Sequence, residues 1–116
     1  MNPEAMKQRT RTFAVAVFAF VEGLPKTVSG QTVARQLARS GSSVAANYRG
    51  AQRAQTRKEF VAKLHDAREE ADETQFWLEF SVDCGCAGHQ GAEPLIREAG
   101  ELTAMLTAAI KTASRA

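Results

Sequence analysis

The apolar pattern between residues 28 and 54 constrains the fold more than any other feature, because it keeps helical phase across a stretch with the composition of a linker. Val33, Leu37, Val44 and Tyr48 fall on one side at about 100° per residue. Between them lies Ser40-Gly41-Ser42-Ser43. A flexible linker would reset the phase, and here the phase is kept. The pattern therefore predicts one helix that starts near Thr27 or Ser29 and ends at about residue 54.

The small residues in the middle of this helix need a physical reason, since a glycine inside a helix costs about 1 kcal/mol relative to alanine. We expect a neighbouring helix to come close over Ser40, Gly41 and Ala45. The alternative is a genuine break of the helix at Gly41, and the sequence leaves that alternative open.

Three further segments have helical signals. Residues 8–22 carry an apolar face and end before Gly23 and Pro25. Thr56-Arg57-Lys58-Glu59 is a capping box, in which the side chains of Thr56 and Glu59 are expected to satisfy each other's backbone N–H groups. It opens a heptad seam of Phe60, Leu64, Ala67, Ala71, Thr74 and Leu78. A glycine-rich loop is expected over residues 83–94, and a last helix from Ala92 or Pro94 to Ala113.

These elements predict an all-α protein. No segment alternates apolar and polar residues as a half-buried strand does. A chain of 116 residues is expected to form one domain, here residues 1–116. Four helices joined by short loops indicate an antiparallel, up-and-down four-helix bundle.

The cysteine content indicates a reducing compartment. Cys84 and Cys86 are the two cysteines, and one intervening residue is too short a spacing for an ordinary disulfide. We therefore expect no disulfide framework and a cytoplasmic location. The basic N-terminus and the apolar run over residues 13–21 have the outline of a secretory signal, but Glu22 follows at once and the run is too short to span a bilayer.

Charge is distributed unevenly along the chain. Residues 1–58 have ten basic and two acidic residues, whereas residues 59–101 have three basic and eleven acidic ones. Four arginines of the second predicted helix lie within a band of about 80°, opposite its apolar face. Two further cations follow at the start of the next helix. The set comprises Arg35, Arg39, Arg49, Arg53, Arg57 and Lys58.

This basic stripe allows three interpretations. Arginine suits phosphate, so the six residues are candidates for contacts with the backbone of RNA or DNA. They could instead pair with the acidic run of residues 66–79, within a chain or between chains. A plain solvated face is the third interpretation, although such faces usually mix charges of both signs.

Other candidate sites are weaker. Cys84, Cys86 and His89 are possible zinc ligands, or a nucleophile with its base, but no second ligand cluster or orienting group accompanies them. A small-residue loop is the simpler interpretation. Asn47 is expected to form a hydrogen bond from helix to helix. No phosphate loop, zinc-protease motif or nucleophile elbow is present, so we expect no enzymatic activity, no cofactor and no bound metal.

Two segments resemble a known family. LPKTVSGQTVARQLARSGSSVAANYRGA (residues 24–51) and RKEFVAKLHDAREEADETQFWLEF (residues 57–80) are similar to the four-helix bundle proteins encoded in intervening sequences of bacterial 23S rRNA genes. The most specific parts are SGSSVAANYR and ADETQFWL. That family is similar in turn to the accessory protein of diversity-generating retroelements.

The resemblance implies a four-helix bundle that assembles into a ring-shaped homopentamer in a bacterial cytoplasm. It implies partners rather than substrates: another copy of the chain, RNA or DNA, or a nucleic-acid enzyme such as a reverse transcriptase, and no membrane. No catalytic residues transfer from the family. The sequence CGCAGH (residues 84–89) departs from the usual pattern of the family.

Overall fold

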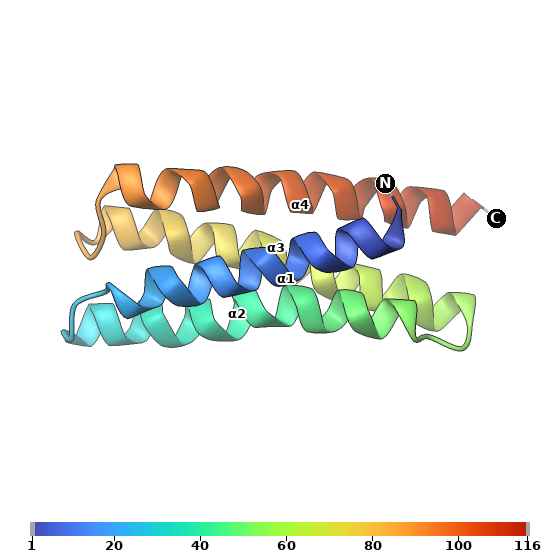
Figure 1. The fold of residues 1–116 in the computed structure, drawn as a ribbon, viewed down its shortest axis with the longest axis horizontal. Helices are drawn as coiled ribbons and strands as arrows, with labels where there is room; N and C mark the ends of the chain where they lie inside the picture. The colour runs from blue at the N-terminus through green and yellow to red at the C-terminus, as the bar shows by residue number, and fades with distance from the viewer. Residues whose placement is uncertain (1, 116) are drawn as a thin grey trace.

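The computed structural model describes residues 2–115 and shows four helices: α1 (Pro3–Glu22), α2 (Val28–Gln52), α3 (Arg57–Asp83) and α4 (His89–Arg115). Consecutive helices run antiparallel in an elongated bundle of 47 × 20 × 19 Å (Figure 1). The α1–α2 and α3–α4 turns lie at one end, and the α2–α3 turn lies at the other end with both termini. The predicted all-α four-helix bundle is confirmed, and no strand occurs in the described part of the chain.

Helix α2 runs without interruption through Ser40-Gly41-Ser42-Ser43. Thr27 caps its start, because the Thr27 hydroxyl accepts a hydrogen bond from Gly30 N at 3.1 Å. The Ser42 hydroxyl donates back to the Ala38 carbonyl at 2.7 Å, which satisfies a polar side chain within the helix. A break at Gly41 was therefore the wrong alternative.

Two helices begin earlier than the sequence predicted. Helix α1 starts at Pro3 instead of residue 8, because Asn2 Oδ1 accepts from Ala5 N at 2.7 Å and Pro3 needs no donor in the first turn. Helix α4 starts at His89 instead of Ala92 or Pro94. Pro94 is tolerated there, because so close to the helix start its missing N–H frees only one exposed carbonyl.

Helix α3 begins where the capping box predicts, and Thr56 Oγ1 accepts from Glu59 N at 3.1 Å. The expected return bond from Thr56 N to the Glu59 carboxylate does not occur in the described structure. Its buried residues include Leu64, Ala67, Ala71, Thr74 and Leu78, which are the predicted heptad positions after Phe60. Phe60 itself is half-buried at the edge of the core. The seam packs α3 between α2 and α4.

The core combines branched aliphatic residues with a few buried hydroxyls. The largest fully buried side chains are Leu37, Leu64, Leu78, Leu102, Leu106, Val17, Val33, Val44, Thr10, Thr74, Ser40 and Ser81. Ser40 is accommodated because the Thr74 hydroxyl forms a hydrogen bond with it at 2.8 Å across the α2–α3 interface. The hydroxyl pair therefore fixes the register of the two helices at the level of the small-residue segment.

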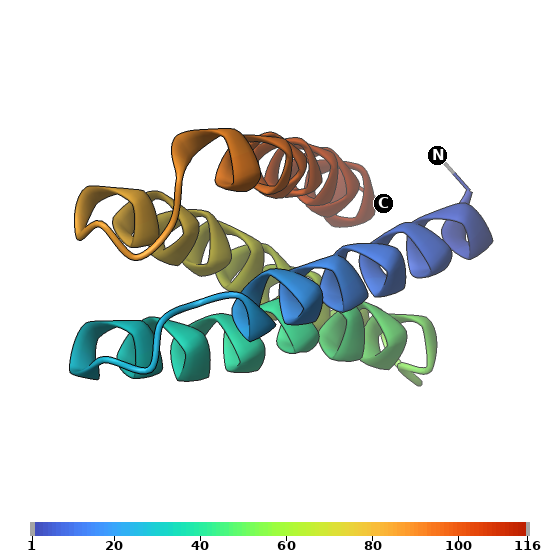
Figure 2. The same ribbon diagram turned by 60° about the vertical axis from the view of Figure 1, so that its left-hand side comes forward.

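Helix α1 packs mainly on α2 and diverges from α4 toward one end of the bundle (Figure 2). Arg9 joins α1 to α4 through two hydrogen bonds of 2.7 Å to the Glu98 carboxylate and one of 2.8 Å to Glu101. These bonds, first those to Glu98, hold the pKa of Arg9 above its ordinary value. No helix within residues 2–115 combines the length and the apolar character needed to cross a membrane.

Candidate nucleic-acid interface

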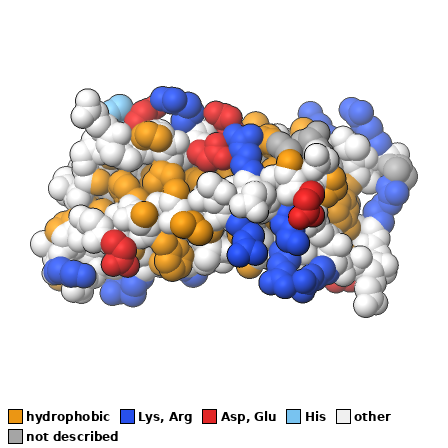
Figure 3. Space-filling model, in the orientation of Figure 1, with side chains coloured by type: hydrophobic (Ala, Val, Ile, Leu, Met, Phe, Trp, Pro, Cys, Tyr) orange, Lys and Arg blue, Asp and Glu red, His pale blue; other side chains and the backbone are white. Residues whose placement is uncertain are grey.

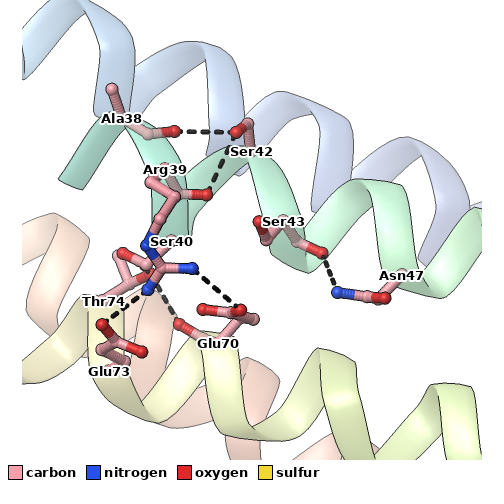
Figure 4. Close-up of polar contacts among 9 residues, drawn as sticks. All are labelled: Ala38, Arg39, Ser40, Ser42, Ser43, Asn47, Glu70, Glu73 and Thr74. Atoms are coloured by element: carbon pink, nitrogen blue, oxygen red, sulfur yellow. Dashed lines mark hydrogen bonds and ion pairs between the residues drawn. The ribbon is translucent and has the colours of Figure 1, made fainter. Parts of the chain in front are cut away.

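Arg39 of the predicted basic stripe is occupied by acids of the same chain. Its guanidinium donates to Glu70 Oε2 at 3.1 Å and to Glu73 Oε1 at 2.6 Å, both on α3 (Figure 4). The hydrogen bonds to Glu70 and then to Glu73 raise the pKa of Arg39. Arg39 therefore stabilises the α2–α3 interface. For this residue, the interpretation that the stripe pairs with the acidic run within one chain is confirmed.

Arg57 is also engaged within the chain. Its Nη1 donates to the Ala113 carbonyl at 2.8 Å, so that the first turn of α3 contacts the last turns of α4. A cation near the carbonyl end of a helix is favourable for the helix dipole as well. Lys58 is adjacent in sequence and exposed.

Arg35, Arg49 and Arg53 form no ion pair with any residue between 2 and 115, and all three are exposed. Arg35 lies one helical turn before Arg39, in the first third of α2, whereas Arg49 belongs to the last turn and Arg53 caps the helix. The stripe thus divides into Arg39 and Arg57, which hold the fold, and free cations concentrated toward the end of α2.

Arg49 shares a cleft with two basic residues of another helix. A cleft of about 210 Å³ between α1 and α2 is lined by Lys7, Arg11, Ala45, Ala46 and Arg49. Lys7 and Arg11 are four residues apart on α1 and therefore lie on the same side of that helix. Ala45 and Ala46 are short, so the floor of the cleft stays open below the three cationic side chains. Figure 3 shows basic side chains gathered over this part of α1 and α2.

The cleft is electrostatically unbalanced. Three cations line it, and no carboxylate does. The positive potential of the three side chains adds up in the cleft, and low-dielectric walls focus it toward the opening. Such a site lowers its own energy by binding an anion. A phosphate group, which has several acceptor oxygens, can accept from an ammonium group and guanidinium forks together.

The sequence alone did not indicate Lys7 and Arg11 as candidate residues. Their four-residue spacing was visible, but the segment was interpreted as the basic flank of an apolar run, and the first helix was expected to start only at residue 8. An earlier start, signalled by Asn2 and Pro3, would have placed both on a helix face. Their proximity to Arg49 depends on how α1 lies on α2, which no local pattern specifies.

The other two candidates from the sequence are Asn47 and the group of Cys84, Cys86 and His89. The Asn47 amide donates to the Ser43 carbonyl of its own helix at 3.0 Å, so the predicted bond to another helix was wrong (Figure 4). His89 is 3.4 Å from the Glu93 carboxylate, one turn along α4. Cys84 and Cys86 are free thiols. No group of three or more potential metal ligands occurs among the residues that the structure describes.

Larger hollows lie at the end of the bundle that holds the termini. One of about 730 Å³ and one of about 450 Å³ share Pro3, Tyr48, Phe60, Thr112 and Ala113 in their walls. They are mostly apolar, and Arg57 is their one charged wall residue. Their chemistry does not suit phosphate as the cleft between α1 and α2 does.

Aromatic residues are exposed near the end of α3. Phe76 is 52% and Phe80 is 40% accessible, and the two rings stack at 5.8 Å. Trp77 contacts both rings edge to face, at centroid distances of 5.0 and 5.5 Å. We call these three residues the aromatic face. Exposed aromatic clusters of this kind are typical of surfaces that contact another macromolecule.

Comparisons with known proteins give a family and a structural relative. Residues 4–108 match the family model of the 23S rRNA-intervening sequence protein. A solved structure from Bacteroides thetaiotaomicron, described as a protein with unknown function from the S23 ribosomal protein family, is similar with a TM-score of 0.86. It is 30% identical in sequence, over 96% of this chain and 99% of that one. No curated protein matches the sequence.

Proposed function

This chain belongs to the 23S rRNA-intervening sequence protein family, and from that premise we propose that it is a non-enzymatic, self-associating module that binds the phosphate backbone of RNA or DNA. The cleft between α1 and α2 is the observation that carries the proposal. It brings Lys7, Arg11 and Arg49 together with no acid in its walls.

The proposed contacts have distinct roles. Lys7, Arg11 and Arg49 bind one phosphate group, and Arg53 and Lys58 meet neighbouring phosphates toward the α2–α3 turn. Arg35 adds long-range attraction. Arg39 and Arg57 act indirectly, because their guanidinium groups are already bonded to Glu70, Glu73 and the Ala113 carbonyl. Such contacts read no base sequence.

Salt dependence tests the proposal. Each phosphate that the protein neutralises releases counterions. One phosphate in the cleft and one each at Arg53 and Lys58 make three, and for single-stranded RNA three neutralised phosphates predict a slope of about −2 in log affinity against log salt. Binding of the full chain to a generic RNA would be measured by fluorescence anisotropy over a salt series. Failure to bind at low salt would refute the proposal.

Self-association is the second part of the proposal. The aromatic face of Phe76, Trp77 and Phe80 supports it, because burying such rings between copies would stabilise an oligomer. The resemblance described above suggests a ring-shaped homopentamer in the cytoplasm. Sedimentation velocity gives the particle mass, and a double Phe76→Ser, Phe80→Ser variant is expected to lower it. An unchanged mass would place the interface elsewhere.

An alternative function is a purely structural assembly protein whose basic cleft contacts acids of a second copy. Arg39 shows that this chain does pair its arginines with acids, although within one bundle. The two functions predict opposite results for an Arg49→Glu variant. Loss of RNA binding with an intact oligomer supports the nucleic-acid module, whereas loss of the oligomer supports the alternative.

For the nucleic-acid-binding function, the proposed protein partner is a nucleic-acid enzyme such as a reverse transcriptase.

A further inference from the structure

The turn between α3 and α4 holds two thiols side by side. Cys84 Sγ is 3.2 Å from Cys86 Sγ and donates its hydrogen bond to it. Gly85 between them has φ of +77°, a conformation that side chains rarely adopt, and it folds the chain so that both thiols lie on the same side of the turn. Cys84 is exposed and Cys86 is half-buried against the core.

The backbone of this turn is anchored while the sulfur atoms stay accessible. Cys84 N donates to the Phe80 carbonyl at 2.9 Å, and Cys86 N and Ala87 N both donate to the Ser81 carbonyl, at 2.9 and 3.0 Å. Apart from Cys84 and Cys86 themselves, no residue would lie within 4 Å of a Cβ added to Gly85, so this side of the turn faces open space. Because Cys84 is also exposed, a small disulfide can reach its sulfur from solvent.

We propose that Cys84 and Cys86 form a redox-active dithiol that exchanges with low-molecular-weight disulfides of the glutathione type. The hydrogen bond to Cys86 raises the pKa of Cys84, so Cys84 first gives up this proton. The exposed Cys84 thiolate then attacks one sulfur of glutathione disulfide, and one glutathione leaves as its thiolate. Cys86, after losing its proton, then attacks Cys84 Sγ and releases the second glutathione. The protein gives up two electrons and two protons, and glutathione disulfide becomes two glutathione molecules.

The same geometry makes the product reversible. A ring that closes over one intervening residue departs from the relaxed separation of disulfide-bonded cysteines and is therefore strained. Strained and exposed disulfides are more oxidising than structural ones. The one-residue spacing thus argues against a structural crosslink but suits a bond that forms and reopens. This inference is independent of nucleic-acid binding.

Intact-mass measurement of the full chain, without reductant, tests the inference. After treatment with glutathione disulfide at native conditions, the chain is expected to lose two hydrogens and to carry no glutathione. Excess reduced glutathione is expected to restore the original mass. The Cys84→Ser and Cys86→Ser variants each keep a single thiol, which can react with glutathione disulfide but has no second thiol to displace the bound glutathione, so each is expected to retain one glutathione and to form none of the internal disulfide.

The inference would be overturned by an unchanged mass, by a stable glutathione adduct on the unmodified sequence, or by a disulfide between two chains. Circular dichroism of the same samples shows whether the helices are intact. Formation of the internal disulfide only in unfolded chains would also count against it, since the juxtaposition of Cys84 and Cys86 belongs to the folded turn. If both serine variants retain glutathione, each thiol can react, and an unchanged mass of the unmodified sequence cannot be due to unreactive thiols.

Discussion

Val17 of α1 lies so close to Gly41 of α2 that a Cβ added to Gly41 would be 2.9 Å from Val17 Cγ1. Val17 is fully buried and its branched side chain has no room to rotate away. The glycine is therefore a packing residue. Its loss of helix propensity is offset by the close approach of α1, which in turn brings Lys7 and Arg11 near Arg49.

Replacing Gly41 with alanine is expected to destabilise the protein. Overpacking a core contact typically costs about 1–3 kcal/mol, which exceeds the gain of about 1 kcal/mol from removing a helical glycine. Urea unfolding measures the change. Gly100→Ala is the matched control, because its Cβ would meet Gln75 Oε1 at an ordinary 3.6 Å, and it is expected to stabilise by about 0.5–1 kcal/mol. Equal effects of the two substitutions would show that Gly41 is not held by Val17.

Removing Arg39 is expected to weaken the α2–α3 interface. Arg39 is about half exposed, so its two ion pairs together are expected to contribute only about 1 kcal/mol. The cost falls mainly on Glu70, since its Oε1 is buried without a partner and Oε2 would lose its donor. Arg39→Gln is compared with Arg35→Gln by thermal unfolding. Arg35 has no ion pair in the described structure and its substitution is expected to change stability by less than about 0.5 kcal/mol. If Arg35→Gln lowered the stability more than Arg39→Gln, the conclusion that Arg39 holds the fold and Arg35 is free would be wrong.

Arg9 and Arg11 are expected to have separable effects. Arg9→Ala removes the bonds to Glu98 and Glu101 and is expected to lower the free energy of unfolding by about 1–2 kcal/mol. Arg11→Ala is expected to leave stability nearly unchanged and to weaken RNA binding several-fold. Unfolding and anisotropy measurements on both variants give the comparison. A reversed pattern would mean that Arg11 supports the fold and Arg9 the ligand.

Tyr48 gives a pH-dependent prediction. Burial raises its pKa above the ordinary value of about 10. The folded protein holds the phenolic proton more tightly than the unfolded chain, so this contribution to stability is complete below about pH 10 and is lost as the pH rises through the folded pKa. Tyr48 is the single tyrosine, so the ultraviolet absorbance of tyrosinate reports it directly. If Tyr48 titrated at the same pH in native buffer and in urea, its phenol would not be buried. The Tyr48→Phe variant shows how much of the stability lost at alkaline pH is due to this one group.

The fold could be predicted from the sequence because its determinants are local and periodic. Val33, Leu37, Val44 and Tyr48 keep one phase through the small residues, and the Thr56 cap fixes the start of α3. The early start of α1 was missed because Asn2 was given too little weight as a cap, and that of α4 because Pro94 was taken to mark the first turn. Both errors lie at helix ends, which an apolar pattern does not locate to the residue.

The candidate site could be predicted only in part. Helical spacing located Arg49 on an exposed side of α2, and it also selected Arg39, which α3 neutralises. No pattern within one helix could show that Glu70 and Glu73 reach Arg39, or that Lys7 and Arg11 flank Arg49. These relationships depend on how the helices are rotated against one another, and Gly41, Val17 and the Ser40–Thr74 bond set that rotation.

The central claim is that the cleft between α1 and α2 binds phosphate, and one comparison tests it most directly. RNA affinity at low salt would be measured for a Lys7→Glu, Arg49→Glu variant and for a Lys26→Glu, Lys111→Glu variant, which has the same net charge but leaves the cleft intact. We expect the cleft variant to lose at least about tenfold more affinity, because each contact to a phosphate is charge-assisted. Equal losses in two folded variants of equal particle mass would mean that net charge alone attracts RNA, and would contradict the claim.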